Sequence, residues 1–132
     1  MASPVLDSLL PRPIKRILIV DDQPLGRELV RTVLESSGYQ VIEAADGEEA
    51  LEKAFSALPD LILLDIHMPA RDGLSVVAEL RRDPRFAATP IIALTATAMK
   101  GDRQKGLEAG FTEYLAKPVS IITLRQTITR FL

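Results

Sequence analysis

The sequence predicts a single α/β domain built on a doubly wound sheet, and three observations support this fold class. The chain has 132 residues, of which 47% are hydrophobic, and this suits one compact domain with a single core. Five short apolar segments alternate with segments of helical periodicity. The apolar segments are hydrophobic on both faces, which is typical of parallel strands with helices on either side of the sheet.

The first strand and helix are well marked. Residues 17–20 are four consecutive large apolar residues, and they predict a buried strand that ends at Asp21. Pro24 suits the first turn of the next helix, and Gly38 suits its C-terminal stop. The expected core-facing stripe of this helix consists of Leu25, Leu29, Val30, Val33 and Leu34.

The next elements repeat the alternation. Residues 40–44 predict a second strand, and Asp46 with Glu49 resembles a capping box at the start of a helix that ends near Leu58. Residues 61–65 are the third strand, which carries an Asp at its last position. A carboxylate there costs free energy unless it has partners or a function.

The second half of the chain continues the pattern. A helix with Leu74, Val77 and Leu80 on one side precedes a fourth strand that Thr95 closes. Ser120 can cap a last helix with Ile121, Leu124, Ile128 and Phe131 inward. The predicted elements are a helix at 73–82, a strand at 91–94, a helix between 100 and 109, a strand at 113–115 and the helix after residue 120.

Composition excludes several functional classes. The net charge of −2 gives no general attraction to nucleic acid or to an anionic membrane. Without cysteine, disulfides, thiolate zinc sites and a Cys nucleophile are excluded, and a single histidine excludes a His-cluster metal site. No apolar run reaches the roughly 18 residues of a membrane span, and the N-terminus lacks signal-peptide features. We expect a cytoplasmic domain at 16–132, preceded by a proline-containing extension at 1–15.

Polar residues stand at four of the predicted strand ends. Asp21 and Asp22 follow the first strand, Asp65 ends the third, Thr95 follows the fourth and Lys117 follows the fifth. Right-handed crossovers place the carboxyl ends of parallel strands at one edge of the sheet, where such folds bind ligands. Three carboxylates, one hydroxyl and one ammonium are therefore expected in one cleft.

This set of groups predicts phosphoryl chemistry with a metal ion. Crowded carboxylates raise one another's pKa unless a cation is present, and Mg²⁺ binds carboxylates together with phosphate oxygens. Asp65 is the candidate nucleophile, with Lys117 as a point charge and Thr95 as a hydroxyl donor. Each residue has a simpler interpretation: the acidic pair could cap the following helix, and Thr95 and Lys117 could be ordinary strand-end and surface residues. His67 is interpreted as a backbone contributor.

With these residues in place, the chain resembles the receiver domain of two-component response regulators, in the CheY-like superfamily. The resemblance covers 16–132 and implies a flavodoxin-like, five-stranded parallel sheet of order 2-1-3-4-5. It depends on four motifs: Ile17-Leu18-Ile19-Val20-Asp21-Asp22, Leu64-Asp65-Ile66-His67-Met68-Pro69 with Asp72-Gly73, Leu94-Thr95-Ala96, and Tyr114-Leu115-Ala116-Lys117-Pro118.

The resemblance implies a role for each strand-end residue. Asp65 would accept phosphate from the phosphohistidine of a sensor histidine kinase or of a histidine phosphotransfer protein. Asp21, Asp22, Asp65 and the backbone carbonyl of His67 would bind Mg²⁺. Lys117 would bind the phosphoryl group, and its peptide bond to Pro118 would be cis.

The resemblance also implies a conformational switch. Thr95 would move toward the phosphoryl group, and Tyr114 would fill the space that it leaves. The face formed by the fourth helix, the fifth strand and the fifth helix, around 100–127, would then change its affinity for a downstream protein. A monomer or a phosphorylation-dependent dimer is expected, and the protein is not expected to turn over outside substrates.

The segment 95–102 resembles DivK-type single-domain regulators and the receivers of hybrid sensor kinases. Because the chain ends after the last predicted helix, a stand-alone regulator is expected, with a fragment of a hybrid histidine kinase as the alternative. A haloacid-dehalogenase phosphatase would have a second Asp where this chain has His67, and a dinucleotide-binding module would have a Gly-rich turn after the first strand. A phosphorylation-independent interaction module is the strongest rival, but it gives no reason for the charged cleft.

Overall fold

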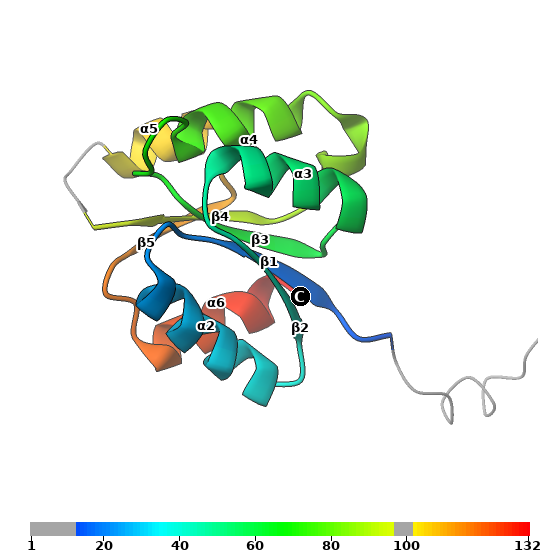
Figure 1. The fold of residues 1–132 in the computed structure, drawn as a ribbon, viewed down its shortest axis with the longest axis vertical. Helices are drawn as coiled ribbons and strands as arrows, with labels where there is room; N and C mark the ends of the chain where they lie inside the picture. Colours follow the sequence, from blue (N-terminus) through cyan, green and yellow to red (C-terminus); the bar gives the residue numbers. More distant parts are fainter. Residues whose placement is uncertain (1–12, 97–101) are drawn as a thin grey trace, which may run out of the picture.

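The computed structural model describes residues 13–96 and 102–132. Its core is a five-stranded parallel sheet of order β2-β1-β3-β4-β5 (Figure 1). The strands are β1 (Arg16–Val20), β2 (Gln40–Ala44), β3 (Leu61–Asp65), β4 (Ile91–Thr95) and β5 (Glu113–Ala116). Each predicted strand is present within one residue of its expected bounds, and the doubly wound fold with its implied strand order is confirmed.

Helices cover both faces of the sheet. Figure 1 shows α3, α4 and α5 on one face and α2 and α6 on the other. The core accordingly forms two hydrophobic layers, one on each side of β1, β3 and β4. The helices are α2 (Pro24–Ser36), α3 (Gly47–Ala57), α4 (Gly73–Arg81), α5 (Asp102–Ala109) and α6 (Ile121–Phe131), with a short 3₁₀ helix η1 (Pro84–Phe86) that the sequence did not predict.

Side-chain caps fix where three helices begin. Asp46 accepts a hydrogen bond from the Glu49 amide at 2.8 Å, as the capping-box pattern predicts, and Ser120 accepts one from the amide of Thr123 at 3.0 Å. Asp72 caps α4 in the same way. These caps begin the helices immediately after the loops at the carboxyl edge of the sheet.

The register of the strands aligns the predicted site residues. Val20, the last residue of β1, pairs with Leu64, and Asp65 pairs with Leu94. Thr95 pairs with Ala116, directly before Lys117. The polar residues that end β1, β3, β4 and β5 therefore lie at one edge of the sheet.

The predicted inward face of α2 is partly wrong. Leu25 is 82% exposed and Leu29 is 60% exposed, whereas Val33 and Leu34 are buried. The row that faces the sheet instead begins at Gly26, and Leu25 lies about 100° around the helix from it. Because a glycine has no side chain to mark this row, the apolar pattern pointed to the leucines beside it. Likewise, Ile121 on α6 is exposed although it was expected to face inward, while Leu124 and Ile128 are buried.

Two predicted segments fall at least partly outside the described residues. They are the proposed N-terminal extension up to residue 12 and the residues 97–101 that precede α5. Within the described part of the chain, no helix is long and apolar enough to cross a membrane.

Candidate functional site

Three carboxylates converge at the carboxyl edge of the sheet. Asp21 and Asp22 lie in the loop after β1, and Asp65 is the last residue of β3. One oxygen from each lies within 4.8 Å of the other two. Asp21 and Asp65 are each only 4% exposed, so water screens their mutual repulsion poorly. Such a cluster favours the binding of a cation.

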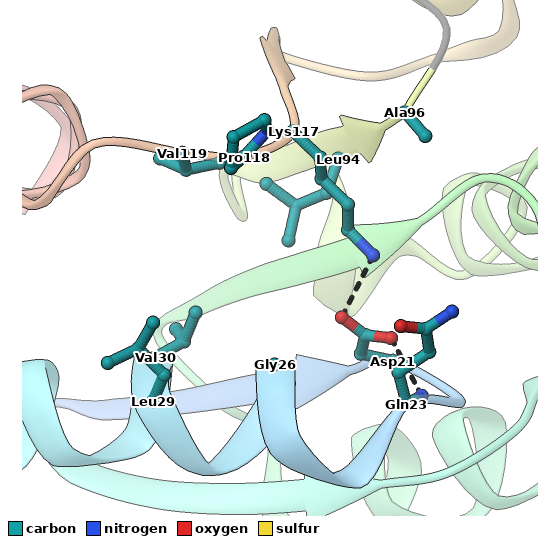
Figure 2. A pocket seen from close by; sticks show the side chains of 10 residues that line it. All are labelled: Asp21, Gln23, Gly26, Leu29, Val30, Leu94, Ala96, Lys117, Pro118 and Val119. Atoms are coloured by element: carbon teal, nitrogen blue, oxygen red, sulfur yellow. Dashed lines mark hydrogen bonds and ion pairs between the residues drawn. The ribbon is translucent and has the colours of Figure 1, made fainter.

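Lys117 supplies one positive charge to this cluster. Its Nζ lies 2.9 Å from Asp21 Oδ2 and 2.9 Å from Asp65 Oδ2. Figure 2 shows the side chain extending from the loop after β5 to Asp21. Burial opposes the charged form of Lys117, but the hydrogen bonds to Asp21 and Asp65 outweigh it, so that its pKa is raised. The peptide bond between Lys117 and Pro118 is cis, as the resemblance implies.

The carboxylate of Asp65 is held by two donors. Lys117 donates to Oδ2, and the backbone N–H of His67 donates to Oδ1 at 3.1 Å. Burial raises the pKa of Asp65 above its ordinary value, although both donors act in the opposite direction. Behind it, a Cβ on Gly73 would lie 2.5 Å from the Asp65 carbonyl oxygen, so only glycine fits at the start of α4.

The loop that carries the acidic pair is fixed to α2. Asp21 Oδ1 accepts a hydrogen bond from the Gln23 amide at 2.9 Å, and the Asp21 carbonyl accepts one from Arg27 Nη1 at 2.7 Å. Arg27 also pairs with Glu43 of β2 at 3.0 Å. Sequence reasoning missed Arg27, since nothing in the motifs links a residue on the first helical turns to a carbonyl six positions earlier.

The two residues with an implied switch role line one cavity. Thr95 is fully buried and Tyr114 is nearly so. Together with Ile66, His67, Leu74, Lys105 and Gly106, they line a cavity of about 210 Å³ that begins at the residues directly after Asp65. Gly106 leaves room for the ring, because a Cβ there would lie 3.2 Å from Tyr114 Cδ2.

A second, largely apolar pocket lies on the other side of the site. It has a volume of about 330 Å³ and connects Asp21 and Lys117 with α2 and the Pro118–Val119 segment (Figure 2). The exposed Leu29 is part of its wall. The charged cleft is therefore bordered by an apolar surface.

The side chains present fit a magnesium ion. Asp21, Asp22 and Asp65 offer only carboxylate oxygens, which a hard divalent cation prefers, and the chain has no cysteine that would favour zinc. The set is also too small for an all-protein calcium cage, which takes six to eight oxygens. The structure thus brings together Asp21, Asp22, Asp65 and Lys117, while Thr95 ends the neighbouring strand β4 and lines the adjacent cavity.

Comparisons with known proteins agree with this arrangement. The profile of the response regulator receiver domain family matches residues 17–129. The polar-differentiation response regulator DivK of Brucella anthropi is 41% identical over 118 residues, which cover 89% of this chain and 96% of that protein.

Solved structures lead to the same family. The chemotaxis protein CheY4 of Vibrio cholerae has a TM-score of 0.86 and 38% identity, covering 91% of this chain and 100% of that one. The receiver domain of a Pseudomonas aeruginosa sensor histidine kinase has a TM-score of 0.83 and 39% identity, covering 90% of this chain and 98% of its own, and it holds a magnesium ion in its active-site cleft. The chain therefore belongs to the response regulator receiver domain family.

Proposed function

We propose that this protein is a single-domain response regulator of a two-component phosphorelay, phosphorylated on Asp65. The donor is the phosphohistidine of a histidine kinase or of a histidine phosphotransfer protein. The observation that carries the proposal is the buried Asp65 carboxylate, which shares the ammonium of Lys117 with Asp21 at 2.9 Å on each side. An interaction module without phosphorylation would have no use for this arrangement.

The proposed reaction is a transfer between two nucleophiles. A carboxylate oxygen of Asp65 forms a new O–P bond, while the N–P bond to the donor imidazole breaks and its electron pair stays on nitrogen. Lys117 stays beside the phosphoryl oxygens and compensates their charge. Asp21, Asp22, Asp65 and the His67 carbonyl would hold Mg²⁺, which supplies further charge neutralisation when it is bound.

Phosphorylation would then be read out through the cavity that Thr95 and Tyr114 line. The phosphoryl group brings new acceptor oxygens beside the Thr95 hydroxyl, and a shift of Thr95 would open space for Tyr114. The affected surface is that of α5, β5 and α6, because Tyr114 lies on β5 and packs against Gly106 of α5. The affinity of this surface for a downstream protein, or for a second copy of the chain, would change. The change can be no larger than the free energy by which phosphorylation favours one conformation over the other.

The direct test is incubation with acetyl phosphate, with Mg²⁺ or with EDTA. We expect one base-labile phosphoryl adduct by mass spectrometry, found only with Mg²⁺ and located on the peptide that contains Asp65. The Asp65→Asn variant should remain unmodified. Failure of the wild type with both acetyl phosphate and a cognate kinase would refute the proposal, and steady hydrolysis of a phosphomonoester would indicate a phosphatase instead.

The apolar surface beside the cleft offers a place for the protein donor. When the imidazole of a donor protein approaches Asp65, the surface of that protein around the imidazole would contact the pocket between Asp21, Lys117 and α2. Leu29, in the wall of this pocket, and Leu25, one helical turn before it on α2, are exposed although they are large and apolar. We infer that they contact the phosphohistidine-bearing partner.

Leu29→Ser is accordingly expected to slow transfer from a phosphorylated histidine kinase by about tenfold, the loss expected if Leu29 is one of the minority of contacts that contribute more than about 1 kcal/mol. Phosphorylation by acetyl phosphate should be unchanged, because this small donor needs no docking surface. Leu107→Ser is the control, since Leu107 is also exposed but lies on α5, across the sheet. Rates are measured by following the phosphorylated protein on a gel. Equal loss with both donors would contradict the inference.

A further inference from the structure

The loop between β3 and α4 carries a residue that belongs to no motif of the sequence analysis. The loop, residues 66–72, includes His67, whose N–H orients Asp65 and whose carbonyl is a proposed metal ligand. Ala70 in this loop has a φ of +67°, a left-handed conformation that is unfavourable for a residue with a Cβ. The loop therefore needs stabilising contacts from outside to keep this shape.

Arg71 makes these contacts. Its Nη1 lies 2.8 Å from Glu48 Oε1 on α3, its Nε lies 3.1 Å from Ser75 Oγ on α4, and its Nη2 pairs with Glu79, also on α4. Each of its three side-chain nitrogens thus has a partner, and the partners lie on two different helices. One guanidinium connects the loop to both.

The backbone and stem of Arg71 are held as well. Its N–H donates to the Pro69 carbonyl at 2.7 Å, closing the turn around Ala70. The turn before α3 packs closely on its side chain, because a Cβ on Gly47 would lie 3.0 Å from Arg71 Cβ. The side chain is only 27% exposed although it lies at the surface. Arg71 is thus half-buried between the elements that it connects.

We propose that Arg71 is a positioning residue for the metal and phosphoacceptor site. By tying the loop to α3 and α4, it keeps the loop in the conformation in which the His67 amide contacts Asp65 and the His67 carbonyl is available to Mg²⁺. The role of Arg71 in Mg²⁺ binding and phosphorylation rests on the proposed function. Its effect on the conformation of the loop does not.

A simpler explanation makes a different prediction. The loop is also held by the hydrogen bond from the Gly73 amide to the Ile66 carbonyl at 2.8 Å and by the close packing of Gly73 on Asp65. If these suffice, the Arg71 ion pairs are ordinary surface interactions, which usually contribute little. Removing the guanidinium would then leave the site unchanged.

The test is Arg71→Met, which keeps most of the apolar stem and removes the charge. In the metal-free protein, we expect the His67 amide resonance to shift and its hydrogen exchange to accelerate. Magnesium affinity, followed by NMR titration, should fall about tenfold, the lower end of the range for residues that support metal ligands from outside. At saturating Mg²⁺, the rate with acetyl phosphate should return to within about twofold of the wild type, because no reacting group has changed.

Two further variants make the result specific. Arg85→Met removes a guanidinium that pairs with Asp83 and has no contact with the loop, so it should leave Mg²⁺ affinity unchanged. Glu48→Ala removes only the tie to α3, from a side chain that is 77% exposed, and should change the affinity in the same direction as Arg71→Met but less. It keeps the test usable if Arg71→Met folds poorly.

An Arg71→Met protein with wild-type Mg²⁺ affinity and an unchanged His67 amide would overturn the inference. So would equal losses in Arg71→Met and Arg85→Met. Because the amide measurements need neither Mg²⁺ nor phosphate, they remain decisive even if the wild type is never phosphorylated. A wild type that is never phosphorylated would refute the proposed function, but it would not contradict the role of Arg71 in the loop.

Discussion

Asp65→Asn is expected to be more stable than the wild type at pH 7, although it can no longer accept a phosphoryl group. Asp65 is 4% exposed, and in the metal-free protein it shares a single ammonium with Asp21. An asparagine removes one of three crowded negative charges and still accepts the hydrogen bond from the His67 amide. The gain should be about 1 kcal/mol, within the usual range for substitutions at strained functional sites.

The stability difference should depend on pH. Burial, the largest influence on Asp65, raises its pKa in the folded protein, so the native state binds this proton more tightly than the unfolded chain. The wild type therefore loses stability as the pH rises through the folded pKa of Asp65, whereas asparagine does not titrate. The advantage of Asp65→Asn is expected to be largest at neutral pH and to shrink toward pH 4.

Urea unfolding followed by circular dichroism, in EDTA and at several pH values, measures this difference; the chain has no tryptophan for a fluorescence assay. Added Mg²⁺ provides the internal control, because it should stabilise the wild type more than Asp65→Asn and narrow the gap at pH 7. An Asp65→Asn protein that is less stable than the wild type at pH 7 would show that the pairing of Asp65 with Lys117 outweighs its burial.

Much of the fold could be predicted because the sequence signals for single strands and helices agree with the overall α/β arrangement. The apolar strands, the caps at Asp46 and Ser120 and the stop at Gly38 all favour the observed elements. The larger error arose where a glycine removed the signal. On α2 the sheet-facing row begins at Gly26, and the periodicity indicated the neighbouring leucines, which the structure shows exposed.

The candidate site was predictable for a topological reason. Parallel strands joined by right-handed crossovers bring their carboxyl ends to one edge, so strand-end residues such as Asp65 and Lys117 meet although they are 52 positions apart. The supporting arginines were not predictable. Arg27 and Arg71 act through a backbone carbonyl and through ion pairs to helices, and the geometry of such contacts depends on loop conformation, which short motifs do not encode.

Arg81 is the supporting residue with the largest expected effect on stability. Its Nε donates to the Gly110 carbonyl at 2.8 Å, and its Nη1 donates to the carbonyls of Phe86 and Thr89 at 2.6 and 2.8 Å. Its Nη2 lies 3.2 Å from Thr112 Oγ1. In the described part of the chain, its side-chain nitrogens bond to three carbonyls and one hydroxyl and not to a carboxylate, and burial lowers its pKa. Arg81 thus joins the end of α4 to η1, to the segment before β4 and to the turn between α5 and β5.

Removing this guanidinium takes the donor from the carbonyls of Gly110 and Thr89, whereas the Phe86 carbonyl keeps the Thr89 amide and Thr112 Oγ1 keeps the Ile91 amide. Arg81→Met is expected to lower the free energy of unfolding by about 3 kcal/mol, since hydrogen bonds to a charged group contribute roughly 1.5–3 kcal/mol and an unsatisfied carbonyl adds its desolvation cost. Arg81→Lys should recover little, because a single ammonium cannot reach acceptors spread over three segments. Phosphorylation at Asp65 should stay near normal at a temperature where the variant is folded, because these contacts lie at the opposite edge of the sheet.

Arg82 provides the matched control, because it is the next residue along the chain and is exposed. Urea unfolding of Arg82→Met should differ from the wild type by less than about 0.5 kcal/mol, as surface substitutions usually do. If Arg81→Met cost no more than Arg82→Met, the four hydrogen bonds would contribute nothing beyond the water that replaces them. If Arg81→Met also lost Mg²⁺-dependent phosphorylation while folded, the two edges of the sheet would be coupled through α4. This helix begins beside Asp65 and ends at Arg81.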